Sequence, residues 1–167
     1  EVCGFGVKII SGEEEARYTY IFASANFEIA KYHALVVDIG GGSAEYSIVN
    51  KGRLERAHSL ELGCNKLTKR FIKNDPMTNS EYQALKEHII KEIEKIRLPK
   101  NIDLVVFTGG SMGNLANMIY LAKRQRTDRT VKYLERKDLK KVINDLRNKT
   151  IAERKEIQGL EEQRADI

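Results

Sequence analysis

The residues best suited to chemistry in this sequence lie around three consecutive glycines, Gly40 to Gly42, which Ser43 follows. Glycine has no Cβ, so a run of glycines lets the backbone bend sharply and bring amide N–H groups close to a bound anion. Asp38 precedes the glycines and Glu45 follows them, and carboxylates are ligands that hard cations such as Mg²⁺ prefer. The sequence therefore predicts a magnesium site formed by Asp38 and Glu45 beside a phosphate-binding turn of Gly40, Gly41, Gly42 and Ser43.

The residues on both sides of this turn have the pattern of β-strands. An apolar run from Leu35 to Ile39 leads into the glycines, and Glu45 to Val49 leads away from them. A mononucleotide-binding loop would carry Gly-Lys-Ser/Thr and a dinucleotide-binding loop would open a helix, so neither is predicted. Strand, glycine hairpin and strand is typical of the phosphate hairpin of actin-like ATPase domains. An ordinary tight hairpin is the structural alternative, although a single Gly-Gly pair would suffice for it.

A second glycine turn follows another buried strand. The strand covers residues 102–107, and the Thr-Gly-Gly-Ser sequence of 108–111 leads from it into a helix. Small residues here let the backbone approach a ligand, and the N-terminus of a helix attracts anions. Gly109, Gly110 and Ser111 are therefore predicted to bind phosphate. Close packing of the strand against the helix is an equally good explanation of the same residues.

Three glutamates open a predicted helix near the start of the sequence. Ser11 and Glu14 have the spacing of a capping box, so we expect a helix to begin just after Ser11 and to continue through Tyr20 or slightly beyond. Glu13, Glu14 and Glu15 lie in its first turn, where the helix dipole stabilises negative charge. The dipole alone explains all three glutamates, and it predicts that Glu15 is ionised at neutral pH.

The remaining pattern completes an α/β domain with a three-strand antiparallel meander. Ser80 and Gln83 have the spacing of a second capping box. The other expected elements are a short strand over residues 6–10, a third meander strand through Leu54, Leu60 and Leu62, a helix over 63–71, a long amphipathic helix stopped by Pro99, and two helices beyond Arg124.

Composition places the chain among globular proteins of one domain: it has 167 residues, of which 41% are hydrophobic. No signal peptide or membrane span is predicted. Cys3 and Cys64 match no metal-binding spacing, and we expect them to be reduced and buried, which fits the cytoplasm. We therefore expect a cytoplasmic protein without a membrane partner.

The positive charge is concentrated in the last third of the chain. Of the net charge of +5, residues 123–156 carry 13 Lys or Arg against 6 Asp or Glu. Such a region either attracts a polyanion or is a solvated helix face, and the sequence does not separate the two. Nucleic acid is the generic partner of a basic patch, but few aromatic residues lie near this one, which disfavours it.

Taken together, five segments resemble the exopolyphosphatase / guanosine pentaphosphate phosphohydrolase family, in the same order along the chain. They are residues 10–17 with Ser-Gly-x-Glu-Glu-Ala-Arg, 37–45 with Asp-Ile-Gly-Gly-Gly-Ser, 62–64, 108–110 and 159–166. The resemblance implies two actin-like (ribonuclease H-like) halves with the active site between them. It also implies Mg²⁺-dependent removal of the terminal phosphate from polyphosphate or from the 5′ end of guanosine pentaphosphate, a nucleotide of the stringent response.

Residue by residue, the resemblance implies that Glu15 is the catalytic residue and that Asp38 and Glu45 hold Mg²⁺. The glycine turns at 40–43 and 109–111 match the two phosphate-binding loops. The sequence departs from the family at Ala44, where a threonine is usual, and at Ser111, which replaces the usual threonine. Neither is a catalytic position, so the departures affect substrate preference rather than the class of reaction.

The resemblance also divides the chain at residue 33. Residues 1–33 are expected to enter from a first actin-like half that lies before residue 1, and 34–167 to form the second half, which would continue beyond the last residue. These residues alone are expected to bind phosphate or Mg²⁺ weakly without appreciable phosphatase activity. The family commonly forms homodimers, which makes a second copy a candidate partner.

Two other functions remain open from the residues. An actin-like module that binds a nucleotide or alarmone without hydrolysis would not need Glu15. A small-molecule kinase of the same superfamily would transfer phosphate from ATP to an acceptor, and the Ser-Gly-x-Glu-Glu-Ala-Arg segment disfavours it.

Overall fold

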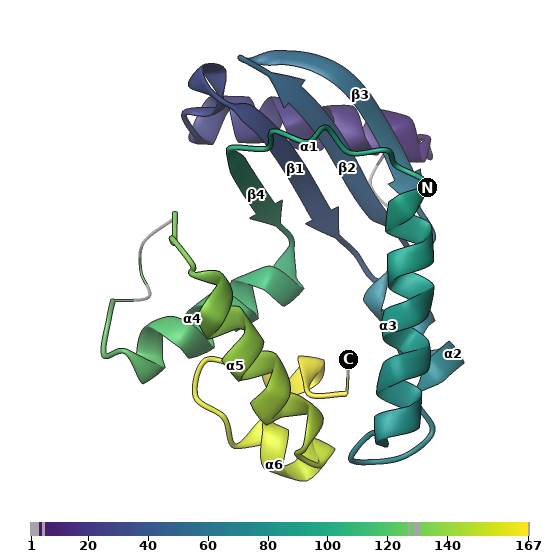
Figure 1. The fold of residues 1–167 in the computed structure, drawn as a ribbon, viewed down its shortest axis with the longest axis vertical. Helices are drawn as coiled ribbons and strands as arrows, with labels where there is room; N and C mark the ends of the chain where they lie inside the picture. Colours follow the sequence, from purple (N-terminus) through teal and green to yellow (C-terminus); the bar gives the residue numbers. More distant parts are fainter. Residues whose placement is uncertain (1–3, 5, 127, 129–130, 167) are drawn as a thin grey trace.

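The computed structural model of the chain describes residues 4, 6–126, 128 and 131–166. Its centre is a mixed sheet with strand order β3-β2-β1-β4, in which β1 pairs with β2 antiparallel and with β4 parallel (Figure 1). The strands are β1 (His33–Ile39), β2 (Ala44–Asn50), β3 (Arg53–Leu60) and β4 (Leu104–Thr108). The predicted α/β class and its antiparallel meander are confirmed. A register shift between Ile48 and Val49 interrupts the β2–β3 pairing.

One face of the sheet is covered by α1 (Gly12–Asn26), which a one-turn helix, η1 (Ile29–Lys31), follows. The predicted capping box is present, with Ser11 and Glu14 each accepting from the other's backbone N–H. Ala23 and Ile29 pack with the sheet residues Ala34, Val36, Val49 and Val106 in a buried core. The prediction of a strand over residues 6–10 is wrong. That segment pairs with none of the four strands of the described sheet, and Val7 is 93% exposed, so its apolar side chains find no packing partner that would hold it as a strand.

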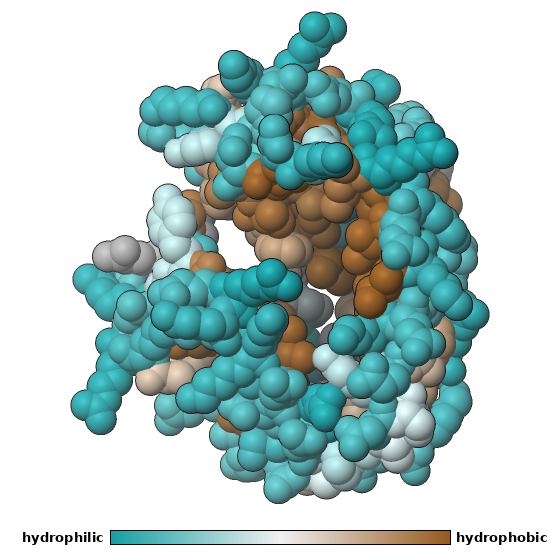
Figure 2. All heavy atoms as spheres, in the orientation of Figure 1, coloured by the Kyte–Doolittle hydropathy of each residue, from teal (hydrophilic) through white to brown (hydrophobic). Residues whose placement is uncertain are grey.

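The opposite face carries α2 (Cys64–Phe71) and α3 (Asn79–Glu94) along one side only. Figure 2 shows apolar side chains gathered over the part of the sheet that these helices leave free. Val105 and Phe107 of β4 are among the exposed ones. The long helix is shorter than expected: it ends at Glu94, and Arg97 has a φ of 51° before Pro99 is reached.

The capping box of α3 is not the one predicted. Thr78 is the N-cap and Glu81 its partner, instead of Ser80 and Gln83. A glutamate three residues after a threonine satisfies the motif better, because its carboxylate is a stronger acceptor than the glutamine amide.

The rest of the chain forms a helical layer beyond the end of β4 (Figure 1). It consists of α4 (Gly110–Ala122), α5 (Arg136–Arg147), α6 (Ile151–Lys155) and η2 (Glu162–Arg164). The two helices predicted beyond Arg124 are confirmed as α5 and α6. Within this layer, α4 is tied to the residue that precedes η2: the buried Asn114 side chain accepts a hydrogen bond from the backbone N–H of Glu161.

None of the described helices is long and apolar enough to cross a membrane. Cys64 is a free, half-buried thiol, and Cys3 lies outside the described residues. The prediction that Cys64 is buried is therefore only partly correct.

We expect Glu81→Gln to destabilise the domain in a pH-dependent way. The Glu81 carboxylate accepts hydrogen bonds from the backbone N–H groups of Thr78 and Lys73 and from the side-chain amide of Asn74, which lower its pKa from 4.5 to about 2. A lowered pKa contributes stability that is fully present above 4.5 and is lost as the pH falls toward 2. Thermal unfolding followed by circular dichroism should therefore show a lower Tm for Glu81→Gln at neutral pH.

The Tm difference from the unsubstituted protein should shrink as the pH falls to about 3. Glu87→Gln, on the exposed side of the same helix, serves as the control and should leave Tm nearly unchanged. A Tm deficit of Glu81→Gln that is the same at both pH values would contradict this account of the carboxylate.

Candidate functional site

The sheet register brings the predicted metal ligands together. Asp38 at the end of β1 pairs directly with Glu45 at the start of β2, and with Thr108 of β4 on its other side. Side chains of residues directly opposite in a sheet point to the same face. That face is the one under α1, since Ser47, two residues after Glu45, donates a hydrogen bond to the carbonyl of Ala16. The two carboxylates therefore lie at one end of the sheet beneath the first turn of α1.

Glu45 is held in place by a neighbour that the sequence did not reveal. Ser59 of β3, its direct partner across the strands, donates a hydrogen bond from Oγ to Glu45 Oε1 over 2.6 Å. Glu45 is only 2% exposed, so this contact fixes a buried carboxylate. Gly12 lies against the same serine, because a Cβ on Gly12 would be 2.4 Å from Ser59 Cβ. The first residue of α1 is thus pressed onto the sheet close to Glu45.

That close approach places Glu15, one turn later, over the other two carboxylates. Glu15 remains an exposed residue, but the partial desolvation of its carboxylate raises its pKa above the usual 4.5, and the charges of Glu45 and Asp38 raise it further. The helix dipole had predicted the opposite direction. Desolvation and the two nearby negative charges together outweigh the dipole, which acts as only a fraction of one charge. The structure therefore gathers Glu15, Asp38 and Glu45 into one electronegative group.

The first glycine turn is fixed by the N-terminus of α2. The backbone N–H of Cys64 donates to the Gly40 carbonyl over 2.9 Å, and that of Lys66 donates to the Gly41 carbonyl over 3.2 Å. Gly63 must be a glycine for this docking, since a Cβ there would lie 2.2 Å from the carbonyl carbon of Gly42. The N–H of Gly40 donates to the Ser43 carbonyl within the turn. The amide of Gly40 is therefore engaged internally, whereas a phosphate cradle had been predicted to use it.

The second glycine turn lies against both Asp38 and an arginine from the end of the chain. Gly109 has a φ of 91°, and a Cβ there would be 2.6 Å from Asp38 Oδ1. A Cβ on Gly110 would be 2.2 Å from Arg164 Nη2. The backbone of this turn is therefore packed between a carboxylate and a guanidinium. Both glycines are needed for close approach, so the packing explanation of these residues is part of what the structure shows.

These elements enclose a cavity of about 270 Å³, which we call the cradle cavity. Its lining residues are Asp38, Ile39, Gly40, Gly41, Cys64, Asn65, Gly109, Gly110, Ser111 and Arg164. Six of the predicted site residues line it: Asp38, Gly40, Gly41, Gly109, Gly110 and Ser111. The other four, Gly42, Ser43, Glu15 and Glu45, do not line it. The two glutamates are connected to the cavity by their closeness to Asp38, which does line it.

Arg164 is the cationic residue that sequence reasoning missed at this cavity. Its segment, 159–166, contributed to the family resemblance, but no role was assigned to it. The Arg164 Nε donates to Glu161 Oε2 over 2.9 Å, which leaves the two terminal nitrogens directed at Gly110. A basic residue so far along the chain from the glycines gives no local signal. Only the packing of η2 against the start of α4 brings it there.

The carboxylates suit Mg²⁺ bound together with phosphate better than a closed metal cage. Within the described part of the chain, no group of three or more His, Cys, Asp or Glu side chains is arranged to hold a metal ion. Mg²⁺ usually takes one or two carboxylates and completes its shell with water and phosphate oxygens. Beside Asp38, the Thr108 hydroxyl is buried without a hydrogen-bond partner among the described residues. An unsatisfied oxygen next to clustered carboxylates fits a hydrated cation.

The sequence profile of the Ppx/GppA phosphatase family matches residues 1–167. Exopolyphosphatase 1 of Mycobacterium tuberculosis is 26% identical over 166 residues, which are 97% of this chain and 48% of that protein. Exopolyphosphatase 2 of the same species is 26% identical over 168 residues, covering 98% of this chain and 52% of that protein. The chain thus spans about half the length of the curated relatives it matches.

Solved structures agree with the sequence relatives. The Ppx/GppA family member of Aquifex aeolicus superposes with a TM-score of 0.87 at 29% identity, over 98% of this chain and 53% of that one. The exopolyphosphatase of Cytophaga hutchinsonii superposes with a TM-score of 0.82 at 26% identity, over 94% of this chain and 52% of that one. These similarities confirm the predicted actin-like fold class.

Proposed function

We propose, since the chain belongs to the Ppx/GppA phosphatase family, that the whole protein hydrolyses the terminal phosphoanhydride bond of inorganic polyphosphate. The observation that carries this proposal is the electronegative group of Glu15, Asp38 and Glu45 beside a glycine-lined cavity. The two Mycobacterium tuberculosis relatives are named exopolyphosphatases, which favours polyphosphate as the substrate over guanosine pentaphosphate. The 5′ phosphate of guanosine pentaphosphate offers the same bond and is the second substrate to test.

Glu15 would act as the general base in this reaction. A water oxygen attacks the terminal phosphorus, the anhydride P–O bond breaks, and the leaving phosphate chain keeps the electron pair. Glu15 takes the proton of the attacking water. A base works best when its pKa lies near the working pH, and the upward shift that partial desolvation and the two neighbouring carboxylates cause moves Glu15 in that direction. A binding module would have no use for such a group.

The cradle cavity would hold the transferred phosphoryl group. Its donors are the backbone N–H groups around Gly41 and at the start of α4, and the terminal nitrogens of Arg164. A guanidinium can donate two parallel hydrogen bonds to a phosphate, and donors arranged before the reaction stabilise charge as it develops. Asp38 and Glu45 would hold Mg²⁺, which supplies positive charge against the phosphate oxygens. A first actin-like half would provide the opposite wall of the site.

We expect Asp38→Asn to raise the Mg²⁺ concentration needed for half-maximal activity of the whole protein. The substitution keeps the shape of the side chain and removes one charge from the group that would hold the cation. The measurement is a Mg²⁺ titration of phosphate release at saturating polyphosphate. Asp103→Asn is the control, because it makes the same change just before β4, at the other end of that strand from Thr108. An unchanged Mg²⁺ requirement for Asp38→Asn would place the cation elsewhere.

The function itself is tested by assaying phosphate release from long polyphosphate and from guanosine pentaphosphate with the whole protein. Release from polyphosphate that depends on Mg²⁺ supports the proposal. Binding of either compound without release would favour a binding module. ADP formation from ATP only when a sugar or carboxylate acceptor is added would favour a kinase.

A further inference from the structure

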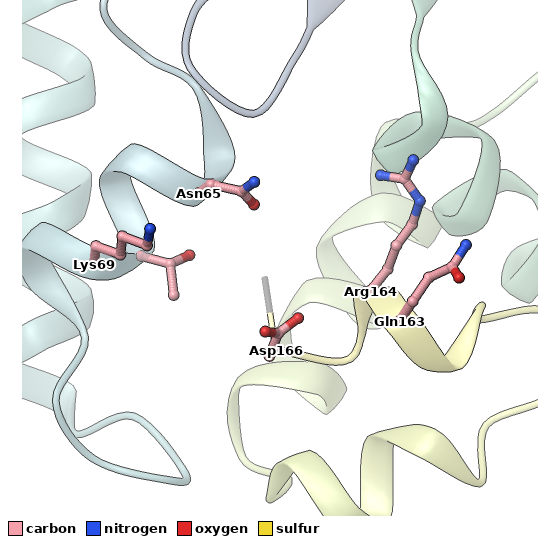
Figure 3. A pocket seen from close by; sticks show the side chains of 6 residues that line it. Asn65, Lys69, Gln163, Arg164 and Asp166 are labelled. Carbon is pink, nitrogen blue, oxygen red and sulfur yellow. The ribbon is translucent and has the colours of Figure 1, made fainter.

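A second polar cavity adjoins the cradle cavity, and we call it the distal cavity. Its volume is about 390 Å³, and it lies between α2 and η2 (Figure 3). The residues that line it are Asn65, Thr68, Lys69, Gln163, Arg164 and Asp166. Figure 3 shows Asn65 and Lys69 on the α2 side and Gln163 and Arg164 on the η2 side. The mechanism proposed above uses only Arg164 of this set.

The lining of the distal cavity favours an anion. Five of its six side chains can donate hydrogen bonds, and two of them, Lys69 and Arg164, carry positive charge. No hydrogen bond or ion pair of the Lys69 ammonium is found among the described residues, so its charge is available to a ligand. Asp166 is the one carboxylate among the six lining residues, so the lining itself carries a net charge of about +1. Glu161, which lies outside the lining, is paired with the Arg164 guanidinium through Nε, so Lys69 is the cation of this cavity that has no carboxylate partner among the described residues.

The two cavities are adjacent. Asn65 and Arg164 line both of them, so these two side chains stand at the boundary. A chain of phosphates whose end lies at the glycine turns can therefore extend past Arg164 toward Lys69. A single phosphate would fill only the cradle cavity.

We propose that the distal cavity is a subsite for the phosphates that follow the terminal one in an inorganic phosphate chain, and that Lys69 binds them. This inference rests on the proposed function, because it takes the cradle cavity as the site of the terminal phosphate. The repeating negative charge of such a chain matches a path with a cation at each end of the distal cavity. The subsite gives the protein a means to prefer a chain over orthophosphate.

The test compares the binding of orthophosphate and inorganic triphosphate to the whole protein by isothermal titration calorimetry, in a Glu15→Gln background that prevents hydrolysis and is expected to leave binding little changed. Lys69→Gln is expected to weaken triphosphate binding roughly three- to tenfold, the effect of losing one partly solvated charge-assisted contact. Its orthophosphate affinity should stay unchanged. Lys91→Gln makes the same charge change on α3, lines neither cavity, and should alter neither affinity. A circular dichroism melt of each variant checks that it folds.

The outcomes separate this inference from the proposed function. Triphosphate binding that Lys69→Gln leaves unchanged, or that falls equally with orthophosphate binding, would overturn the subsite alone. Failure of the whole Glu15→Gln protein with Lys69 intact to bind either anion would overturn the phosphate cradle and the subsite with it. A larger effect of Lys69→Gln on guanosine triphosphate than on inorganic triphosphate would assign the cavity to a nucleotide and overturn the inorganic chain.

Discussion

Replacing Glu15 by Gln is expected to lower the turnover of the whole protein about 10²–10⁴-fold, the usual effect of removing a positioned base. Glutamine has the same shape but cannot accept the proton of the attacking water. Substrate binding should change little, because the cradle cavity is lined by the glycine turns and Arg164 and does not include Glu15. The measurement is kcat for phosphate release, with substrate affinity determined separately.

Glu13→Gln is the matched control for this experiment. Glu13 lies in the same first turn of α1, but its side chain is directed toward His58, with Glu13 Oε1 3.4 Å from His58 Nδ1. It should retain near-normal turnover. If Glu15→Gln retained it as well, Glu15 would be only a favourable charge at a helix N-terminus.

The pH dependence follows from the direction of the Glu15 pKa. That pKa is raised, so the unprotonated base is lost as the pH falls through a value above 4.5, and activity should fall with it. The sign for stability is the reverse of the usual carboxylate case. A raised pKa gives stability that is present below 4.5 and lost as the pH rises through the folded value, so ionised Glu15 opposes folding. Glu15→Gln should therefore raise Tm at neutral pH while it lowers turnover.

Short-range patterns predicted much of this fold and six of the ten residues that line the cradle cavity. The strand register followed from the glycine hairpin, because a tight turn fixes which residues lie opposite each other, and this put Asp38 beside Glu45. The capping box at Ser11 was also local. These features depend on residues within a few positions of one another, and so they can be recognised in the sequence.

Contacts between distant segments could not be predicted in the same way. Ser59 reaches Glu45 only after β3 pairs with β2, and Arg164 reaches Gly110 only after the last turn packs on α4. The pKa of Glu15 shows the same limit. Its helix position predicted a stabilised charge, whereas the tertiary fold partly desolvates the carboxylate and adds two like charges, and together these raise its pKa.

Gly109→Ala and Gly113→Ala should change the stability of the domain in opposite directions. Gly109 has a φ of 91° and a ψ of 158°, a region essentially restricted to glycine where an L-residue costs about 1–3 kcal/mol, and its new methyl group would lie 2.6 Å from Asp38 Oδ1. Gly113, four residues further on in α4, has nothing within 4 Å of the added Cβ. Alanine is better than glycine inside a helix by roughly 0.5–1 kcal/mol. Chemical denaturation should therefore show a lower free energy of unfolding for Gly109→Ala and a higher one for Gly113→Ala than for the unsubstituted protein.

The same pair of variants tests whether the close approach of Gly109 to Asp38 matters for catalysis. The methyl group of Gly109→Ala must push either the turn or the Asp38 carboxylate away, and a shift of about 1 Å in a reacting group can cost about 10²-fold in rate. Phosphate release by the whole protein should fall by that order for Gly109→Ala and stay near normal for Gly113→Ala. Full activity of Gly109→Ala would mean that the second glycine turn serves packing alone. The phosphate would then be held by the first turn and Arg164.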